Sequence, residues 1–247
     1  MLSLKKGFPF ATVNNQTVYI DDDSDAINNN FLGKYIDIGK SHKFQFIPPN
    51  DAFRMAIFGA AGSGKSTFVA SVLKEYKKKY KKNKIYMISP TKDDEAYADL
   101  NKSIDYIKID DSLITDPMEF TEFGGENNGC MIVFDDSEML SSDKELNKAI
   151  ELFRNQCLEN GRKRKISVIV INHVAQNGQQ TKKILNECHL TCVFPKSNFA
   201  AVQRLAKAYW GFGKDELEYL RNVPSRWTVV KSSYPQAILS EHAIKLL

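Results

Sequence analysis

Residues 59–66 read Gly-Ala-Ala-Gly-Ser-Gly-Lys-Ser, a glycine-rich stretch with the spacing of a P-loop. Glycines let backbone N–H groups turn inward around a phosphate, and the N-terminus of a following helix favours the anion. In this motif the lysine, Lys65, reaches the β- and γ-phosphates, and the hydroxyl of Ser66 is a ligand of Mg²⁺. We therefore predict a nucleoside triphosphate site formed by Gly59, Ala60, Ala61, Gly62, Ser63, Gly64, Lys65, Ser66 and Thr67.

The residues on either side of this loop have the properties that the motif requires. An apolar, strand-like run at 55–58 precedes it, and a helix-like run at 67–80 follows it. A chance glycine-rich turn would lack this strand–loop–helix context. The lysines of the far end of the helix, within 74–84, allow two interpretations: contact with nucleic acid, or a solvated helix end at which the dipole favours cations.

A second group of candidate residues follows the apolar run 131–134, which ends in Asp135 and Asp136. P-loop NTPases place an Asp at such a strand end to hold the Mg²⁺ shell, and we assign Asp135 to this role. Asp136 is then the candidate that polarises the attacking water, with Glu138 as its rival.

A third group lies around the next apolar run, 167–171. It ends in Asn172 and His173, of which Asn172 is the first candidate for a side chain that senses the γ-phosphate. The basic run 162–165 comes before it. Three interpretations of this run are open: it is solvated, it binds DNA, or it supplies an arginine finger to a neighbouring subunit. Arg162 is the first candidate for the finger, followed by Arg204 and Arg226.

The elements that must position these residues alternate between strands and helices from residue 53 onward, which is typical of a parallel sheet covered by helices. The central strands are continuous apolar runs, as expected when both faces of the sheet are covered. Strands are predicted at 54–58, 84–88, 106–109, 131–134, 166–171, 190–194, 227–231 and 237–239, and helices at 65–82, 92–101, 143–160, 179–187, 198–210 and 214–221.

The first 50 residues differ from the rest, because short alternating runs at 17–20 and 43–47 are separated by polar segments. We predict a small β-type lead-in at 1–52 and an ATPase domain at 53–247. The N-terminus lacks the apolar run of a signal peptide, and no stretch approaches 18 apolar residues, so neither secretion nor a membrane span is expected. The net charge of +4 permits a polyanionic partner without demanding one.

The four cysteines form no CxxC pair, and Cys130 and Cys192 lie in apolar, strand-like runs. Reduced, buried thiols are the expected state. Cys188, His189 and Cys192 offer only three ligands to zinc, whereas a structural zinc site normally has four.

Several further segments resemble the genome-packaging ATPases of large double-stranded DNA viruses and virophages, which belong to the FtsK–HerA superfamily. The resemblance covers roughly residues 53 to 247. Its most specific parts are Phe194-Pro195-Lys196 and Ser225-Arg226-Trp227. The superfamily often has Asp-Glu where this chain has Asp135-Asp136, which leaves the identity of the catalytic carboxylate open between Asp136 and Glu138.

The resemblance implies a RecA-like α/β fold, an ATPase that uses Mg²⁺ and ATP, a ring-shaped homo-oligomer, and translocation of duplex DNA into a preformed capsid. It also implies sequence-independent DNA binding, contact with capsid or portal-vertex proteins, and a location in the host cytoplasm, the viral factory or the capsid. The main alternative is a small-molecule or nucleotide kinase whose lid contains 162–165. A GTP-dependent switch is disfavoured because 101–104 lacks the Asp of the guanine motif, and a non-catalytic DNA-binding subunit is disfavoured by the P-loop and the Asp pair.

Overall fold

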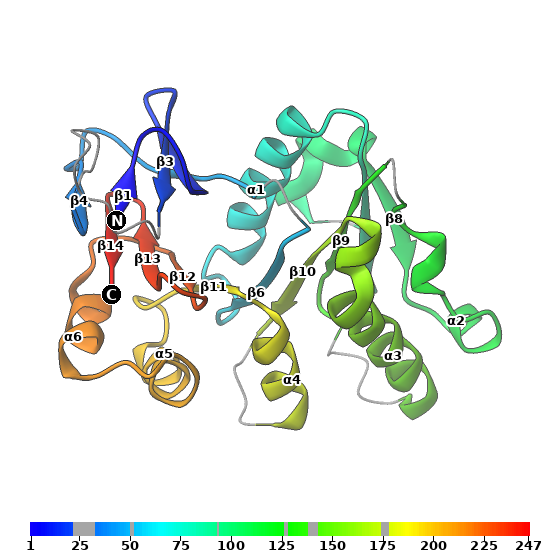
Figure 1. Ribbon diagram of the computed structural model, residues 1–247. Coiled ribbons are helices and arrows are strands. Elements are labelled where there is room, and N and C mark those ends of the chain that lie inside the picture. The colour runs from blue at the N-terminus through cyan, green and yellow to red at the C-terminus, as the bar shows by residue number, and fades with distance from the viewer. Residues whose placement is uncertain (22–32, 50–51, 93, 126–127, 138–142, 174–177) are drawn as a thin grey trace.

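The computed structural model describes residues 1–21, 33–49, 52–92, 94–125, 128–137, 143–173 and 178–247. Within these residues the largest element is a ten-stranded sheet with the order β4-β14-β13-β12-β11-β6-β10-β9-β7-β8 (Figure 1). Its parallel part consists of β6 (Arg54–Phe58), β7 (Lys84–Ser89), β8 (Ile104–Lys108), β9 (Cys130–Phe134), β10 (Ile166–Asn172) and β11 (Leu190–Val193).

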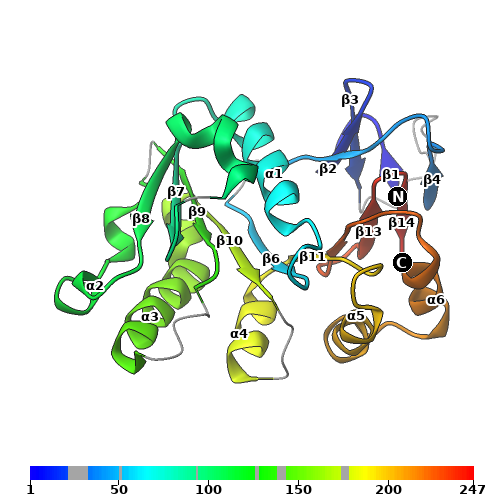
Figure 2. The same ribbon diagram turned by 180° about the vertical axis from the view of Figure 1, so that it is seen from behind.

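Helices cover both faces of the parallel strands, because successive side chains of a strand point to opposite faces. Met55 and Ile57 of β6 pack in one apolar cluster with α1, whereas Ala56 and Phe58 pack in a second cluster with the helices of the other face. The first face carries α1 (Lys65–Lys79) and η1 (Glu95–Ser103), and the second carries α2 (Ser112–Thr115), α3 (Lys144–Asn160), α4 (Gln179–Glu187), α5 (Phe199–Leu205) and α6 (Lys214–Asn222) (Figure 2).

The other end of the sheet is antiparallel. The hairpin strands β12 (Thr228–Lys231) and β13 (Ala237–Ser240) correspond to the predicted closing pair. Two strands were not predicted: β14 (Ala243–Leu246) and β4 (Tyr35–Asp37), which pair with each other across more than 200 positions of the sequence. Such a pairing is set by tertiary contacts and leaves no local signal in the sequence.

A second, four-stranded sheet contains β1 (Leu2–Ser3), β2 (Phe8–Val13), β3 (Gln16–Ile20) and β5 (Gln45–Phe46). Its buried residues, among them Phe10 and Val18, belong to the same apolar cluster as Leu239 and Ile244 of the large sheet. Because β4 of the large sheet also comes from the first 50 residues, this segment contributes to both sheets.

Two predicted helices differ in type from a regular α-helix. The segment predicted at 92–101 is the 3₁₀-helix η1. The segment predicted at 198–210 is α5 followed by a π-helical turn, η4 (Ala206–Trp210), which ends at Gly211 with a φ of 69°. Short 3₁₀ segments, η2 (Phe120–Glu122) and η3 (Gly161–Arg164), precede β9 and β10.

All four cysteines are free and buried, and burial raises the pKa of the Cys130 thiol to about 12. The described part of the chain contains no group of three or more His, Cys, Asp or Glu side chains placed to hold a metal ion. Nor does any described helix combine the length and apolar character that a bilayer crossing requires.

The shared core predicts that the four-stranded N-terminal sheet and the large, ten-stranded sheet unfold together. Phe10 is fully buried, and Phe10→Ala should lower the free energy of unfolding by about 3–5 kcal/mol. Both tryptophans, Trp210 and Trp227, lie outside the N-terminal sheet. Urea unfolding followed by tryptophan fluorescence should therefore shift to a lower midpoint, whereas the exposed Leu4→Ala control should leave it unchanged. An unaltered midpoint for Phe10→Ala would show that residues 1–52 fold independently.

Candidate nucleotide-binding site

The three groups of candidate residues follow three neighbouring strands. Phe58 at the end of β6 lies opposite Asn172 of β10, and Val170 of β10 lies opposite Phe134 at the end of β9. The carboxyl ends of parallel strands meet at one edge of the sheet, where ligands of such sheets usually bind. The P-loop, Asn172-His173 and Asp135-Asp136 therefore come together, with β10 between the other two strands.

The backbone of the P-loop takes conformations that favour glycine. Gly62 and Gly64 have φ angles of 72° and 99°, in the left-handed region. A Cβ on Gly59 would lie 2.4 Å from the Ser63 Oγ and 2.8 Å from the Phe194 ring. Gly64 is also the N-cap of α1 and offers no capping side chain, so the first N–H groups of that helix face the loop.

The ammonium group of Lys65 lies inside this loop. Lys65 is only 7% exposed, and its Nζ donates to the carbonyl oxygens of Gly59 at 2.9 Å and Ala60 at 3.2 Å. Its third contact is the Nδ1 of His173 at 3.3 Å. Burial lowers the pKa of Lys65, while the carboxylates of Asp136 and Asp135 act in the opposite direction.

His173 connects Lys65 to the acidic pair. An ammonium group can only donate, so His173 Nδ1 accepts from Lys65, and the ring proton of a neutral imidazole lies on Nε2. Nε2 then donates to the Asp136 Oδ1 at 2.6 Å. Asp136 has a φ of 50°, in a region that few residues other than glycine adopt. The chain Lys65–His173–Asp136 thus links the P-loop, β10 and β9.

Asp135 occupies a more enclosed position than Asp136. Burial is the main cause that raises the pKa of Asp135 to about 6, with Asp136 and Asp94 adding to it and Lys65 and Tyr97 opposing it. The hydroxyl of Tyr97 donates to the Asp135 Oδ2 at 3.5 Å. A carboxyl with this environment gains from a cation beside it.

Tyr97 is a site residue that the sequence did not reveal. It lies on η1, is 1% exposed, and its hydroxyl lies beside Ser66 and donates to Asp135. Burial raises the pKa of Tyr97, so the phenol stays protonated and can donate. The only local signal is that Tyr97 and Leu100 form an apolar pair at helical spacing in a polar segment, which predicts burial but not contact with Ser66 and Asp135.

The residues present fit a nucleoside triphosphate and a divalent cation. The Ser63 Oγ is buried with no hydrogen-bond partner among the described residues, and the space beside Gly62 is open. Inward-facing amides, a buried ammonium and a carboxyl with a raised pKa are the groups that a bound phosphate and metal would satisfy.

Arg162 does not join this cluster. It is exposed on η3, before the amino end of β10, and lines a cavity of about 640 Å³ with Phe8, Arg54 and His189. The seven residues of β10 separate it from the P-loop by roughly 20 Å, at about 3.3 Å per residue.

Of the rival arginines, Arg204 is exposed on α5. Arg226 lies at the edge of the sheet that carries the P-loop, because Thr228 of β12 is opposite Val193 of β11, which is opposite Phe58. Glu138, the rival of Asp136, lies outside the described residues.

This fold and site define a P-loop NTPase with a RecA-like sheet. The family model described as Poxvirus A32 protein matches residues 47–194, and the chain belongs to this family. An uncharacterized protein of the Sputnik virophage is 30% identical over 253 residues, covering 98% of this chain and 97% of the relative. These matches confirm the resemblance to viral packaging ATPases drawn from the sequence.

Solved structures of low sequence identity share the fold. The genome packaging NTPase B204 from Sulfolobus turreted icosahedral virus 2, in complex with ATP-gammaS, has a TM-score of 0.51 and 12% identity, covering 78% of this chain and 98% of that chain. EssC from Geobacillus thermodenitrificans has a TM-score of 0.52 and 15% identity; the match covers 85% of this chain but only 44% of the EssC chain. The predicted mostly parallel α/β fold with helices on both faces is confirmed.

The contact of Tyr97 with Asp135 predicts a specific effect on metal binding. Tyr97→Phe removes one hydroxyl and should raise the Mg²⁺ concentration for half-maximal nucleotide binding about three- to tenfold, since a net hydrogen bond contributes roughly 0.5–1.5 kcal/mol. Nucleotide binding in EDTA should be unchanged. The measurement is fluorescence titration with a labelled ATP analogue at several Mg²⁺ concentrations. Tyr106→Phe, on the neighbouring β8, is the matched control; equal effects of the two changes would contradict the assignment.

Proposed function

We propose that this chain is a viral genome-packaging ATPase, which hydrolyses ATP with Mg²⁺ and uses the energy to move double-stranded DNA into a preformed capsid. The observation that carries the proposal is the Lys65–His173–Asp136 chain at the common edge of β6, β10 and β9. It joins the P-loop to the Asp136 carboxylate through the imidazole of His173, which hydrogen-bonds to both Lys65 and Asp136. Membership of the Poxvirus A32 family and the likeness to a packaging NTPase support it.

In the proposed mechanism, backbone N–H groups of the P-loop and of the first turn of α1, together with the ammonium of Lys65, hold the phosphates. Ser66 and Asp135, both beside Tyr97, would hold Mg²⁺, which neutralises charge on the phosphate oxygens when bound. The move of Lys65 to a phosphate removes the donor from His173 Nδ1. Nδ1 of His173 can then accept a hydrogen bond from another donor while Nε2 still donates to Asp136.

Asp136 is the proposed group that orients and polarises the attacking water. Its hydrogen bond to His173 fixes one carboxylate oxygen and leaves the other available. Asn172 is the proposed sensor of the γ-phosphate, because it is 1% exposed at the end of β10, where the Gly59 N–H donates to its backbone carbonyl oxygen at 3.3 Å. This bond joins the P-loop to the strand end that carries the side-chain amide.

The proposed partners are duplex DNA, a ring of identical subunits, and capsid or portal-vertex proteins. In such a ring Arg162 would act on the nucleotide of a neighbouring subunit, since its own P-loop lies at the opposite edge of the sheet. The site of action is the host cytoplasm or viral factory.

The kinase alternative gains no support from the geometry of its candidate lid. Arg164 donates to the carbonyl oxygens of Phe123 and Gly124, which holds the run 162–165 at the edge away from the P-loop. A kinase lid must instead close over the transferred phosphate.

Lys65 should be essential for hydrolysis. Lys65→Ala removes the ammonium that contacts the phosphates and should lower the rate of ATP hydrolysis at least about 100-fold, the usual cost of a missing transition-state donor. Phosphate release is the measurement, with circular dichroism as the test of folding. Lys74→Ala, on an exposed turn of the same helix, is the control and should retain full activity. Normal turnover by a folded Lys65→Ala protein would refute the site.

The two aspartates should have separable roles. Asp136→Asn should retain nucleotide binding and lose hydrolysis about 10²- to 10⁴-fold, the range of a general base, whereas Asp135→Asn should weaken Mg²⁺-dependent nucleotide binding. Titration with a labelled ATP analogue and single-turnover hydrolysis distinguish them. If Glu138→Gln trapped bound ATP while Asp136→Asn still hydrolysed it, the water-activating role would belong to Glu138.

DNA binding should depend on salt and not on base sequence. Of the predicted basic surfaces, Lys77 and Lys79 donate to the backbone carbonyls of Asn83 and Pro48, whereas Lys81 and Lys163 are exposed. Lys163→Ala and Lys81→Ala should each reduce the slope of log affinity against log salt by about 0.9 if the residue contacts a phosphate. Lys182→Ala, on α4, is the control. A DNA affinity that does not change with salt concentration, or that is much higher for one base sequence, would favour another function.

A further inference from the structure

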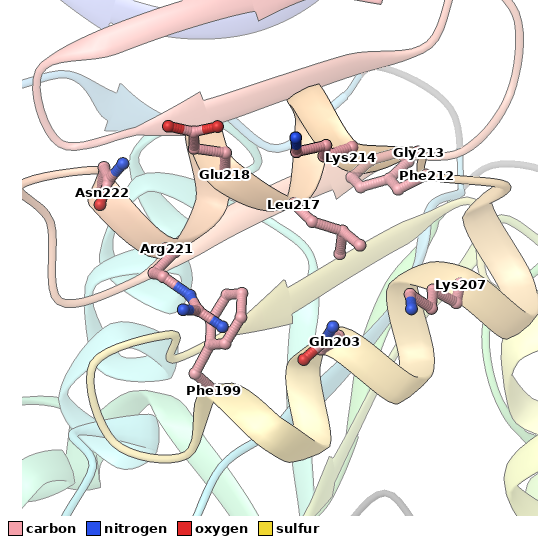
Figure 3. A pocket seen from close by; sticks show the side chains of 10 residues that line it. All are labelled: Phe199, Gln203, Lys207, Phe212, Gly213, Lys214, Leu217, Glu218, Arg221 and Asn222. Atoms are coloured by element: carbon pink, nitrogen blue, oxygen red, sulfur yellow. The ribbon is translucent and has the colours of Figure 1, made fainter.

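A groove lies between two helices at the antiparallel end of the molecule, apart from the nucleotide site. The helix α5 with its π-helical turn η4 forms one wall, and α6 forms the other (Figure 3). The cavity between them measures about 520 Å³, which is within the usual range of ligand sites. Phe199, Leu217 and Phe212 line it on its apolar side, and the buried Leu217 and Phe212 form its floor.

Cations surround this apolar strip. Arg221 lies over the Phe199 ring, with its guanidinium carbon 4.5 Å from the ring centre, at one end of the groove. Lys214 and Lys207 lie toward the other end, on opposite walls, and both are exposed. Neither lysine forms an ion pair with any residue that the structure describes. Glu218 is the single acidic side chain that lines the groove, so positive charge is in excess.

The length of the groove limits what it can hold. The nine residues of α6 span about 13 Å at 1.5 Å per residue. An extended peptide rises about 3.3 Å per residue, so roughly four residues fit along the strip. The positions of the cations then match acidic side chains at both ends of such a segment, with apolar side chains between them.

We propose that this groove binds a short acidic segment of a partner protein, in which one or two large apolar residues are flanked by Asp or Glu. Charge complementarity favours this occupant over a neutral peptide. Duplex DNA would use the three cations, but it has no apolar group to place against Phe199, Leu217 and Phe212.

The position of α5 connects this groove to the nucleotide site. The opposite side of α5, with Ala201, Val202 and Leu205, lines a small cavity together with Gly59 and His173. Lys196, just before α5, donates to the carbonyl oxygen of Arg221 at 2.9 Å. A segment bound in the groove therefore contacts a helix that lines a cavity beside the P-loop, and any effect of one ligand on the affinity of the other must be reciprocal.

The test uses the full-length protein and a fluorescein-labelled peptide in which a Phe-Leu pair has Asp-Glu on each side. Two control peptides replace the acidic residues by Asn and Gln, or the Phe-Leu pair by Ser-Ser. Fluorescence anisotropy should show saturable binding of the first peptide and at least about tenfold weaker binding of both controls. Comparable binding of the neutral control would overturn the proposal.

Protein variants locate the binding. Lys207→Glu combined with Lys214→Glu should weaken binding of the acidic peptide about tenfold or more, because two exposed ion pairs become repulsive. Lys182→Glu on α4 makes the same kind of charge change elsewhere and should have no effect. Equal peptide binding by the double variant and the wild-type protein would overturn the proposal. It would also be overturned if the double variant kept its affinity for the peptide but lost affinity for a 30-base-pair DNA duplex. Binding of a labelled ATP analogue, measured in the same variants, shows separately whether the P-loop site is intact.

Discussion

The structure depends on the buried ammonium group of Lys65. A charge removed from water is costly unless polar partners surround it, and the partners here are two carbonyl oxygens of the P-loop and the ring of His173. Asp136 and Asp135 favour the charged form from slightly further away. The same contacts that stabilise the cation join the P-loop to His173 and, through it, to Asp136. In the proposed mechanism, a phosphate takes the place of these partners of Lys65.

This arrangement requires a particular order of strands. With β10 between β6 and β9, a residue that follows β10 lies within reach of both the P-loop and the acidic pair. His173 uses its two ring nitrogens toward these two neighbours: Nδ1 accepts from Lys65, and Nε2 donates to Asp136. On the other side of the pair, η1 places Tyr97 against Asp135 and Ser66. Tyr97 thus reaches the site from η1 on one face of the sheet, whereas Asp135, Asp136 and His173 follow the ends of β9 and β10.

Much of this organisation could be predicted from the sequence, because the central strands are buried on both faces and read as unbroken apolar runs. The strand 54–58 and the helix 179–187 agree with the structure residue for residue. The adjacency of the P-loop to Asp135 and Asn172 follows from the rule that carboxyl ends of parallel strands meet. The features that were not predicted depend on contacts between residues that lie far apart in the sequence. Nothing near Tyr97 in the chain indicates Asp135, 38 residues away. The pairing of β4 with β14 is likewise set by distant contacts.

The most direct test of this account is a structure of the protein with Mg²⁺ and a non-hydrolysable ATP analogue. The account predicts that Lys65 Nζ leaves Gly59 O and His173 Nδ1 and contacts the terminal phosphates, while Ser66 and Asp135 bind the metal and His173 keeps its bond to Asp136. A bound nucleotide with Lys65 still held by Gly59 and His173, or a metal held without Ser66 and Asp135, would contradict it.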